Sequence, residues 1–187
     1  AKGQVGHALS WNTALFHIAR PLAYDYAGER IVDGTQTHSG LDAGLQWHQQ
    51  QWLLAGQMQW IHARISGTSI NTDLNGSTPL NVPNYTLRAM AQYRFADVPG
   101  LRTSLRLIHE GARRVTEDGR INLPSWTTLD FAAHYDTRIS GTRTQWTLAV
   151  DNLADHHYWR EAPKQFGHYY LYPGAPRTLR MGVKASF

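Results

Sequence analysis

The chain has 187 residues, of which 17% are charged and 11% are aromatic, and its mean hydropathy is −0.46. A typical soluble domain carries about 25% charged residues, so this chain is polar without being charged and is rich in rings. Its formal net charge is +4, but lysine and arginine are scattered without a run of five like charges, which argues against a nucleic-acid-binding protein. The lack of cysteine excludes disulfides, thiolate metal sites and cysteine nucleophiles.

Alternation of apolar and polar residues with a period of two is the main structural signal. A strand places alternate residues on one face, whereas a helix would spread them around its circumference. The alternation is irregular in the first and fifth segments and clearest at the C-terminus, where Leu179, Met181 and Val183 alternate with Arg180 and Lys184. In chain order, the pattern predicts eight strands at residues 7–21, 36–49, 52–65, 84–96, 101–113, 126–138, 143–152 and 177–187.

The lengths of these strands and of their connections favour a membrane protein. Most predicted strands are longer than the five or six residues usual in globular proteins and match the roughly nine to eleven that a tilted strand needs to cross a bilayer. Long connections alternate with short ones: the long ones cover 22–35, 66–83, 114–125 and 153–176, and the short ones cover 50–51, 97–100 and 139–142. This pattern is typical of an all-β, up-and-down antiparallel transmembrane β-barrel, with the ring-bearing face toward lipid and the polar face toward a wet lumen. The C-terminus is then expected on the side of the short turns.

Several segments resemble motifs of TonB-dependent ferric-siderophore receptors. The most specific are Asn152-Leu153-Ala154-Asp155, followed by Tyr158, and Gly174-Ala175-Pro176-Arg177 before a last strand that ends in Phe187. Upstream, the resemblance extends to Thr13–Ile18, Thr37–Asp42, Leu123–Trp126 and Asp130. Ser39 and Asp42 depart from the family pattern, which commonly has Arg and Glu at these places.

The resemblance covers nearly all of the chain and implies a barrel of about 22 strands with an N-terminal plug domain. Residues 1–187 would be the C-terminal part of that barrel, about its last eight strands, without the plug. The implied function is uptake of a ferric siderophore across the outer membrane, driven by the TonB complex through the plug. The implied protein is not an enzyme and needs no cofactor, because iron arrives as the ferric siderophore. Phe187 would be the signal to the barrel assembly machinery, and the outer surface would contact lipid and lipopolysaccharide.

On this resemblance, ligand contacts are expected from loops at the outer mouth. Arginines there could pair with an anionic ferric chelate, although loop arginines also meet lipopolysaccharide phosphate and loop rings also pack against each other. The candidates are Arg113, Arg114, Tyr158, Trp159, Arg160, Tyr169, Tyr170 and Tyr172. No metal site is expected, because His156 and His157 are neighbours that would point to opposite faces of a strand. No catalytic constellation stands out, and Asp130 and Asp136 are expected to line the lumen.

Two other interpretations remain. The first is a self-contained eight-stranded outer-membrane barrel with a structural, adhesion or enzymatic role, since eight strands can close. Such a barrel must fill its interior, whereas many inward positions here are small and suit a wide barrel: Ala8, Gly40, Gly44, Ala55, Ala132, Ala149 and Gly182. The second is a soluble ligand-binding barrel with the faces exchanged, in which Leu179 and Met181 would be enclosed and Arg180 would lie outside.

Overall fold

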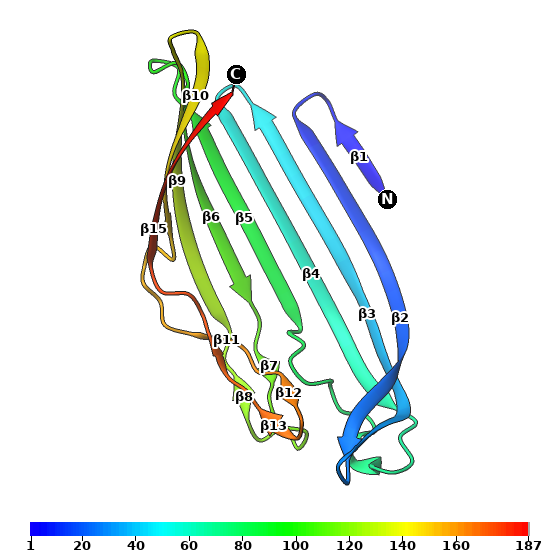
Figure 1. Ribbon diagram of the computed structural model, residues 1–187. Coiled ribbons are helices and arrows are strands. Elements are labelled where there is room, and N and C mark those ends of the chain that lie inside the picture. The colour runs from blue at the N-terminus through cyan, green and yellow to red at the C-terminus, as the bar shows by residue number, and fades with distance from the viewer. Residues whose placement is uncertain (187) are drawn as a thin grey trace.

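The computed structural model describes residues 1–186, and most of them form one antiparallel sheet of nine strands (Figure 1). The strands follow the order of the sequence across the sheet: β1 (Lys2–Val5), β2 (Leu9–Tyr26), β3 (Glu29–Gln49), β4 (Trp52–Ser66), β5 (Tyr85–Arg94), β6 (Leu101–Glu110), β9 (Trp126–Ile139), β10 (Thr142–Asp151) and β15 (Thr178–Ser186). The predicted antiparallel up-and-down arrangement is confirmed. Within residues 1–186, no helix is long and apolar enough to cross a membrane.

The two ends of the sheet differ, as the connection lengths predicted. At one end, here called the loop end, residues 67–84, 111–125 and 152–177 connect the strands. These loops contain a short helix, η1 (Thr72–Leu74), and three small pairs: β7 (Arg113–Arg114) with β8 (Asn122–Leu123), β11 (Trp159–Glu161) with β14 (Tyr172–Pro173), and β12 (Lys164–Gln165) with β13 (His168–Tyr169). Short turns join the strands at the opposite end, here called the turn end, and the last strand runs toward it (Figure 1).

The long loop predicted at 22–35 was wrong. β2 continues to Tyr26 and β3 begins at Glu29, so only Ala27 and Gly28 form the turn. Both have positive φ, 51° and 87°, which is the conformation of the two-residue turns that match the twist of paired strands. Pro21 lies inside β2, where the pairing accommodates it by a register shift between Pro21 and Ala23. A proline at such a bulge costs little because its missing N–H falls outside the regular ladder.

Two other boundaries also differ from the prediction. The first four residues after Ala1 form β1, an additional strand that pairs with the start of β2. Its sequence Lys2-Gly3-Gln4-Val5 is too short to show a period of two. The strand predicted at 101–113 ends at Glu110, and the two arginines that follow belong to the small β7–β8 pair.

The two faces of the sheet have opposite character. One row of directly paired residues crosses seven strands and is apolar throughout: Trp47, Leu54, Ala91, Leu105, Phe131, Val150 and Leu179. On the same face Leu179, Met181 and Val183 are 59%, 75% and 59% exposed, so they are not sealed in a dry centre. The other face lines a hollow of about 720 Å³ whose wall includes Arg88 and Arg106. The apolar face is therefore the outer one, which contradicts the soluble barrel with exchanged faces.

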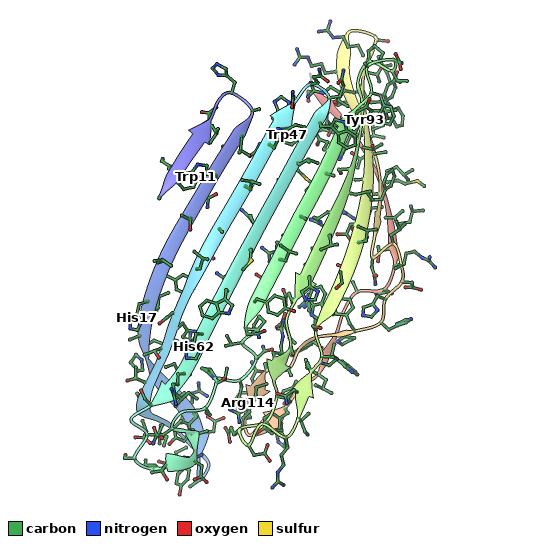
Figure 2. All side chains as sticks on the ribbon, turned by 180° about the vertical axis from the view of Figure 1, so that it is seen from behind. Trp11, His17, Trp47, His62, Tyr93 and Arg114 are labelled. Atoms are coloured by element: carbon green, nitrogen blue, oxygen red, sulfur yellow. The ribbon has the colours of Figure 1, made fainter. Side chains whose placement is uncertain are left out.

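Aromatic residues mark both borders of the apolar face. Near the turn end lie Trp47, Trp52, Tyr93, Tyr135 and Trp146, and the rings of Trp52 and Tyr93 are 4.7 Å apart. Toward the loop end Trp60 pairs with Tyr85, beyond which His17 and His62 lie (Figure 2). Trp52 and Trp60 are eight residues apart, roughly 26 Å along a strand. This spacing fits the apolar band of about 25 Å between the aromatic girdles of membrane barrels.

Candidate functional site

A cavity of about 270 Å³ lies at the loop end, on the inner side of the sheet. One wall is the β2–β3 hairpin with loop 67–84, and the other is formed by loops 111–125 and 152–177. Leu22, Tyr24, Ile65 and Leu74 form a buried apolar cluster on the first wall. The rest of the lining is polar and includes Arg20, Gln36, Glu117 and Lys164.

Asp33 ties loop 67–84 to the hairpin that makes the first wall. Its carboxylate accepts hydrogen bonds from the backbone N–H groups of Ser69 and Ile70, both at 3.0 Å, from the Ser69 hydroxyl at 2.9 Å and from the Tyr24 hydroxyl at 2.8 Å. The Ile70 and Ser69 amides, which favour the ionised form, hold the pKa of Asp33 well below its usual range. Asp33 is therefore a charged anchor for the loop and not a free acid.

An ion pair ties the two loops of the second wall together. Lys164 Nζ donates to Glu117 Oε1 at 2.7 Å and lies 5.4 Å from the centre of the Tyr169 ring. Burial disfavours the charged lysine, but the bond and the charge of Glu117 outweigh it, so the pKa of Lys164 is raised. Behind this pair, Val115, Leu123 and Ala162 form a second small apolar cluster.

Asn81 joins loop 67–84 to the second wall. Its backbone N–H donates to the Arg114 carbonyl at 2.9 Å, and its side-chain oxygen accepts from the Ala162 N–H at 3.0 Å and from the Arg113 guanidinium at 3.3 Å. Arg113 is buried and also pairs with Glu110. All three loops are thus connected through one residue that itself lines the cavity.

None of the eight ligand-contact candidates proposed from the sequence lines this cavity. Arg113 and Arg114 lie in the β7–β8 pair, where they bind other loops, and Arg160 Nε is 3.0 Å from Glu161. Trp159, Tyr169, Tyr170 and Tyr172 are 39–45% exposed on the small strands of loop 152–177 and the residues between them. Their contact with a ligand stays a prediction.

Tyr158, the remaining candidate, packs inside the loop end. Its ring stacks on Trp126 with centroids 4.3 Å apart, and a Cβ at Gly174 would lie 2.1 Å from the Tyr158 Cζ atom. Position 174 therefore needs a glycine because the tyrosine ring lies directly against its backbone. Tyr158 is half-buried in these contacts, and its contact with a ligand stays a prediction.

The residues that carry the family resemblance converge at this place. Asn152 is buried, its side-chain nitrogen donates to the His156 and Ala175 carbonyls at 2.9 and 3.0 Å, and its oxygen accepts from the His156 N–H at 2.9 Å. Asp155 accepts from the Arg177 N–H at 2.8 Å. The two C-terminal motifs are thus bonded to each other and fix where the last strand begins.

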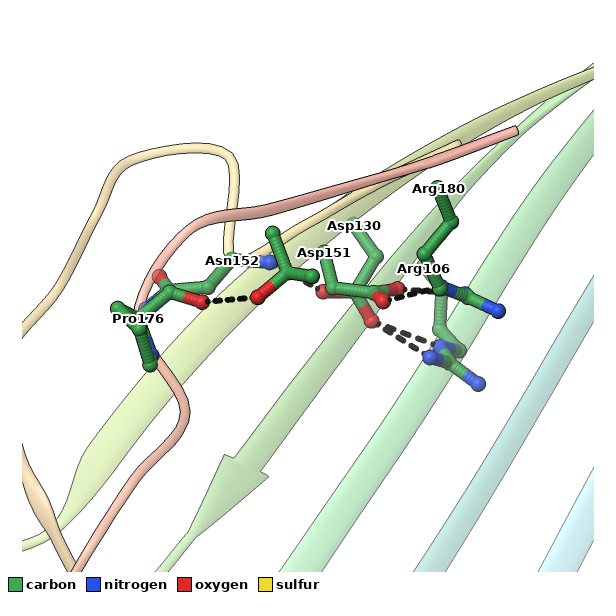
Figure 3. A network of polar contacts seen from close by, with 7 residues as sticks. Arg106, Asp130, Asp151, Asn152, Pro176 and Arg180 are labelled. Carbon is green, nitrogen blue, oxygen red and sulfur yellow. Dashed lines mark hydrogen bonds and ion pairs between the residues drawn. The ribbon is translucent and has the colours of Figure 1, made fainter. Parts of the chain in front are cut away.

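Ion pairs on the inner face continue this network (Figure 3). Asp130 accepts from the Asn152 N–H at 2.8 Å and from two nitrogens of Arg106 at 2.9 and 2.7 Å. Arg180 makes a two-point contact with Asp151 at 2.6 and 2.8 Å. These carboxylates hold strands β6, β9, β10 and β15 together and so stabilise the wall of the sheet.

Sequence reasoning missed the cavity residues Arg20, Gln36 and Lys164. The first two had a weak signal, because each lies at or near the loop end of a predicted strand. Lys164 lies in a long loop, where no periodicity places it. In the part of the chain that the structure covers, no three His, Asp or Glu side chains are arranged to hold a metal ion. Phe187, proposed as an assembly signal, lies outside the described residues.

Comparisons with known proteins agree with this architecture. The sequence profile of the family described as "TonB dependent receptor-like, beta-barrel" matches residues 7–153. The ferrichrome receptor FcuA of Yersinia enterocolitica is 25% identical over 177 residues, which are 93% of this chain and 23% of that protein. The metal-pseudopaline receptor CntO of Pseudomonas aeruginosa is 28% identical over 141 residues, 74% of this chain and 19% of that protein.

A solved structure supports the same fold. The ferric preacinetobactin receptor BauA of Acinetobacter baumannii superposes with a TM-score of 0.83 at 21% identity, and the superposition covers all of this chain and 28% of that one. The chain therefore spans between 19% and 28% of the length of these relatives. With a profile match that extends over most of its length, the chain belongs to the TonB-dependent receptor-like β-barrel family, whose members are proteins of the bacterial outer membrane.

Proposed function

We propose that this chain is the C-terminal part of the barrel of a TonB-dependent receptor that takes up a ferric siderophore. The observation that carries the proposal is the family match over residues 7–153 on a sheet with one apolar and one polar face. Because the chain spans only about a quarter of its relatives, the plug domain and the other strands would lie in the rest of the polypeptide. Support for a siderophore as the ligand comes from the receptors to which the chain is similar.

The complete barrel would have about 22 strands. Within residues 1–186 the sheet is open: β15 pairs with β10 alone, and β1 pairs with β2 alone. Strands from elsewhere in the protein would cover these two edges, since an exposed edge with unpaired N–H and C=O groups is not tolerated in lipid. A self-contained eight-stranded barrel would instead require β15 to pair with a strand near the N-terminus of this chain.

In the proposed cycle, the ferric siderophore binds at the loop end, which faces outward. The TonB complex then acts on the plug, and the chelate passes through the lumen along the polar face. This chain supplies binding groups and the wall and no catalytic step, and iron is cargo and not a cofactor. The apolar face would contact lipid and, at its outer border, lipopolysaccharide. Phe187 would serve the barrel assembly machinery as its recognition signal.

Iron uptake by the full-length protein tests this proposal. The gene is expressed in a bacterium that lacks its own siderophore receptors, and uptake of radioactive iron is measured with a ferric trihydroxamate, a ferric triscatecholate and ferric citrate. Uptake of at least one chelate that disappears when the TonB protein is deleted is the expected result. Uptake of none of them, or uptake that persists without TonB, would overturn the proposal and favour a structural or adhesion role.

A further inference from the structure

Arg20 differs from the other cations around the cavity. Most positive side chains at the loop end have a carboxylate partner: Arg30 with Asp25 at 3.1 Å, Lys164 with Glu117 at 2.7 Å, Arg160 with Glu161 at 3.0 Å, Arg120 with Asp118 at 3.4 Å and Arg113 with Glu110. Among the residues that the structure describes, Arg20 has no such partner. Its recorded side-chain bond is to the Gln36 amide oxygen, at 3.1 Å.

The position of Arg20 makes this free charge available inside the cavity. Arg20 and Gln36 are direct partners across β2 and β3, both on the inner face, and both line the cavity. The bond to Gln36 uses one of the five N–H donors of the guanidinium and holds the side chain in one orientation. The remaining donors have no partner within residues 1–186.

The surroundings leave that charge accessible. The same cavity is lined by the apolar cluster of Leu22, Ile65 and Leu74, whereas Arg20 itself is exposed, so its free donors are open to a ligand. The two acids on the lining, Asp25 and Glu117, are already paired with Arg30 and Lys164. A ligand in the cavity therefore meets a net positive charge at one defined point.

We infer that Arg20, oriented by Gln36, recognises a negative charge on the bound chelate and makes the receptor selective for anionic ferric chelates. The inference rests on the proposed function and narrows its substrate class. A ferric trihydroxamate is neutral, because its three hydroxamate charges cancel those of Fe³⁺. Ferric triscatecholates and ferric citrate are anionic, and their catecholate or carboxylate oxygens suit the planar fork of a guanidinium.

Binding measurements on the full-length receptor in outer-membrane vesicles test the inference with the same three chelates. The unchanged receptor should bind ferric triscatecholate or ferric citrate more tightly than the ferric trihydroxamate. Arg20→Gln should weaken binding of the anionic chelate about tenfold, since a bond between charged groups has roughly that effect, and should leave the neutral chelate unchanged within about twofold. Arg20→Lys keeps the charge but not the planar fork. Its affinity for the anionic chelate should therefore lie between those of the unchanged receptor and Arg20→Gln.

Arg64→Gln is the matched control. Arg64 also has no carboxylate partner within residues 1–186, but it lies on the outer face, next to Gly76. The substitution changes the net charge by the same amount and should not change the affinity for any of the three chelates. An equal loss in both arginine variants would show that only the overall charge matters, which would overturn the inference.

The remaining outcomes separate this inference from the proposed function. If the receptor binds the neutral chelate at least as tightly as the anionic ones, or if Arg20→Gln binds the anionic chelate normally, the inference is wrong and the uptake function stands. If no chelate binds, the proposed function fails and the inference fails with it. Should Arg20→Gln not reach the membrane, Gln36→Leu removes the group that orients Arg20 and must also reduce the preference for the anionic chelate.

Discussion

The side-chain oxygen of Asn81 accepts a hydrogen bond from the backbone N–H of Ala162, 81 residues further along the chain, at 3.0 Å. Ala162 is fully buried, so its N–H has no access to water as an alternative partner. Asn81 has a φ of 59°, a left-handed conformation that asparagine and glycine adopt more easily than other residues. One residue therefore combines an unusual backbone conformation with the bonds that connect three loops.

Asn81→Gly separates these two roles, because glycine keeps the backbone conformation and removes the acceptor. We expect loop 152–177 to exchange its amide hydrogens faster in the full-length receptor, since a buried donor without a partner costs about 1–3 kcal/mol. Asn81→Asp keeps an oxygen acceptor and should protect the loop nearly as well as the unchanged residue. Hydrogen-exchange mass spectrometry measures both variants. Equal protection in Asn81→Gly and the unchanged protein would contradict the role of the side chain.

The attachment of loop 67–84 should depend on pH through Asp33. The pKa of this carboxyl is lowered in the folded protein by the Ile70 and Ser69 amides, so the ionised form stabilises the attachment. That stabilisation is fully present above the ordinary pKa of an aspartate, about 4, and is lost as the pH falls from there toward the lower folded pKa. Limited digestion by pepsin between pH 4 and pH 2 should cut loop 67–84 increasingly fast.

Asp33→Asn provides the control for the pH experiment. The amide does not ionise. After correction for the pH dependence of pepsin activity itself, the variant should be cut at a rate that changes little over the same pH range. It should also be cut faster than the unchanged protein at pH 4, because it lacks the charge that accepts from Ser69 and Ile70. A pH dependence equal to that of the unchanged protein would show that another group controls the loop.

Gly174→Ala should destabilise the start of the last strand. The new methyl group would meet the Tyr158 ring at a distance that real Cβ atoms do not show, so the tyrosine must leave its stack on Trp126 or the backbone must move, at a cost of about 1–3 kcal/mol. Gly56→Ala is the control, because a Cβ there meets nothing within 4 Å. Urea unfolding in detergent compares the two. If both variants unfold at the same urea concentration as the unchanged protein, the close contact is not important for stability.

Residues 1–187 alone should not form a stable monomer in water. The outer face exposes large apolar side chains, such as Leu15 at 85% and Met181 at 75%, and both edges of the sheet offer unpaired backbone groups. The isolated chain should therefore aggregate without detergent or the missing strands, as gel filtration would show. A detergent-free monomer with a sharp, cooperative thermal transition would be inconsistent with a barrel fragment.

The strands were predictable because their signal is local. Alternation places the side chains of Leu179 and Met181 on one face whatever the rest of the protein does, and in the structure the hollow lies against the opposite face. The prediction failed at residues 22–35, which were predicted as a loop. A bulge and the two-residue turn at Ala27 and Gly28 keep the hairpin continuous there.

The candidate site was much less predictable. Rings and arginines in the loops were chosen by residue type, yet Arg113 binds Asn81 and Glu110, and Tyr158 is covered by Trp126. Residue type does not reveal which charges are already neutralised. Arg20 was not singled out, although its free guanidinium faces the cavity, because nothing near it in the sequence shows that the surrounding carboxylates have other partners.

By itself, therefore, the sequence determined that this chain is a two-faced antiparallel sheet, because the period of a strand and the length of a turn depend on neighbouring residues only. The tertiary structure decided which loop residues are structural and which are available to a ligand. That division depends on contacts such as Asn81 with Ala162 and Lys164 with Glu117. Such contacts join residues far apart in the chain, and they form only when the curvature of the sheet brings its loops together.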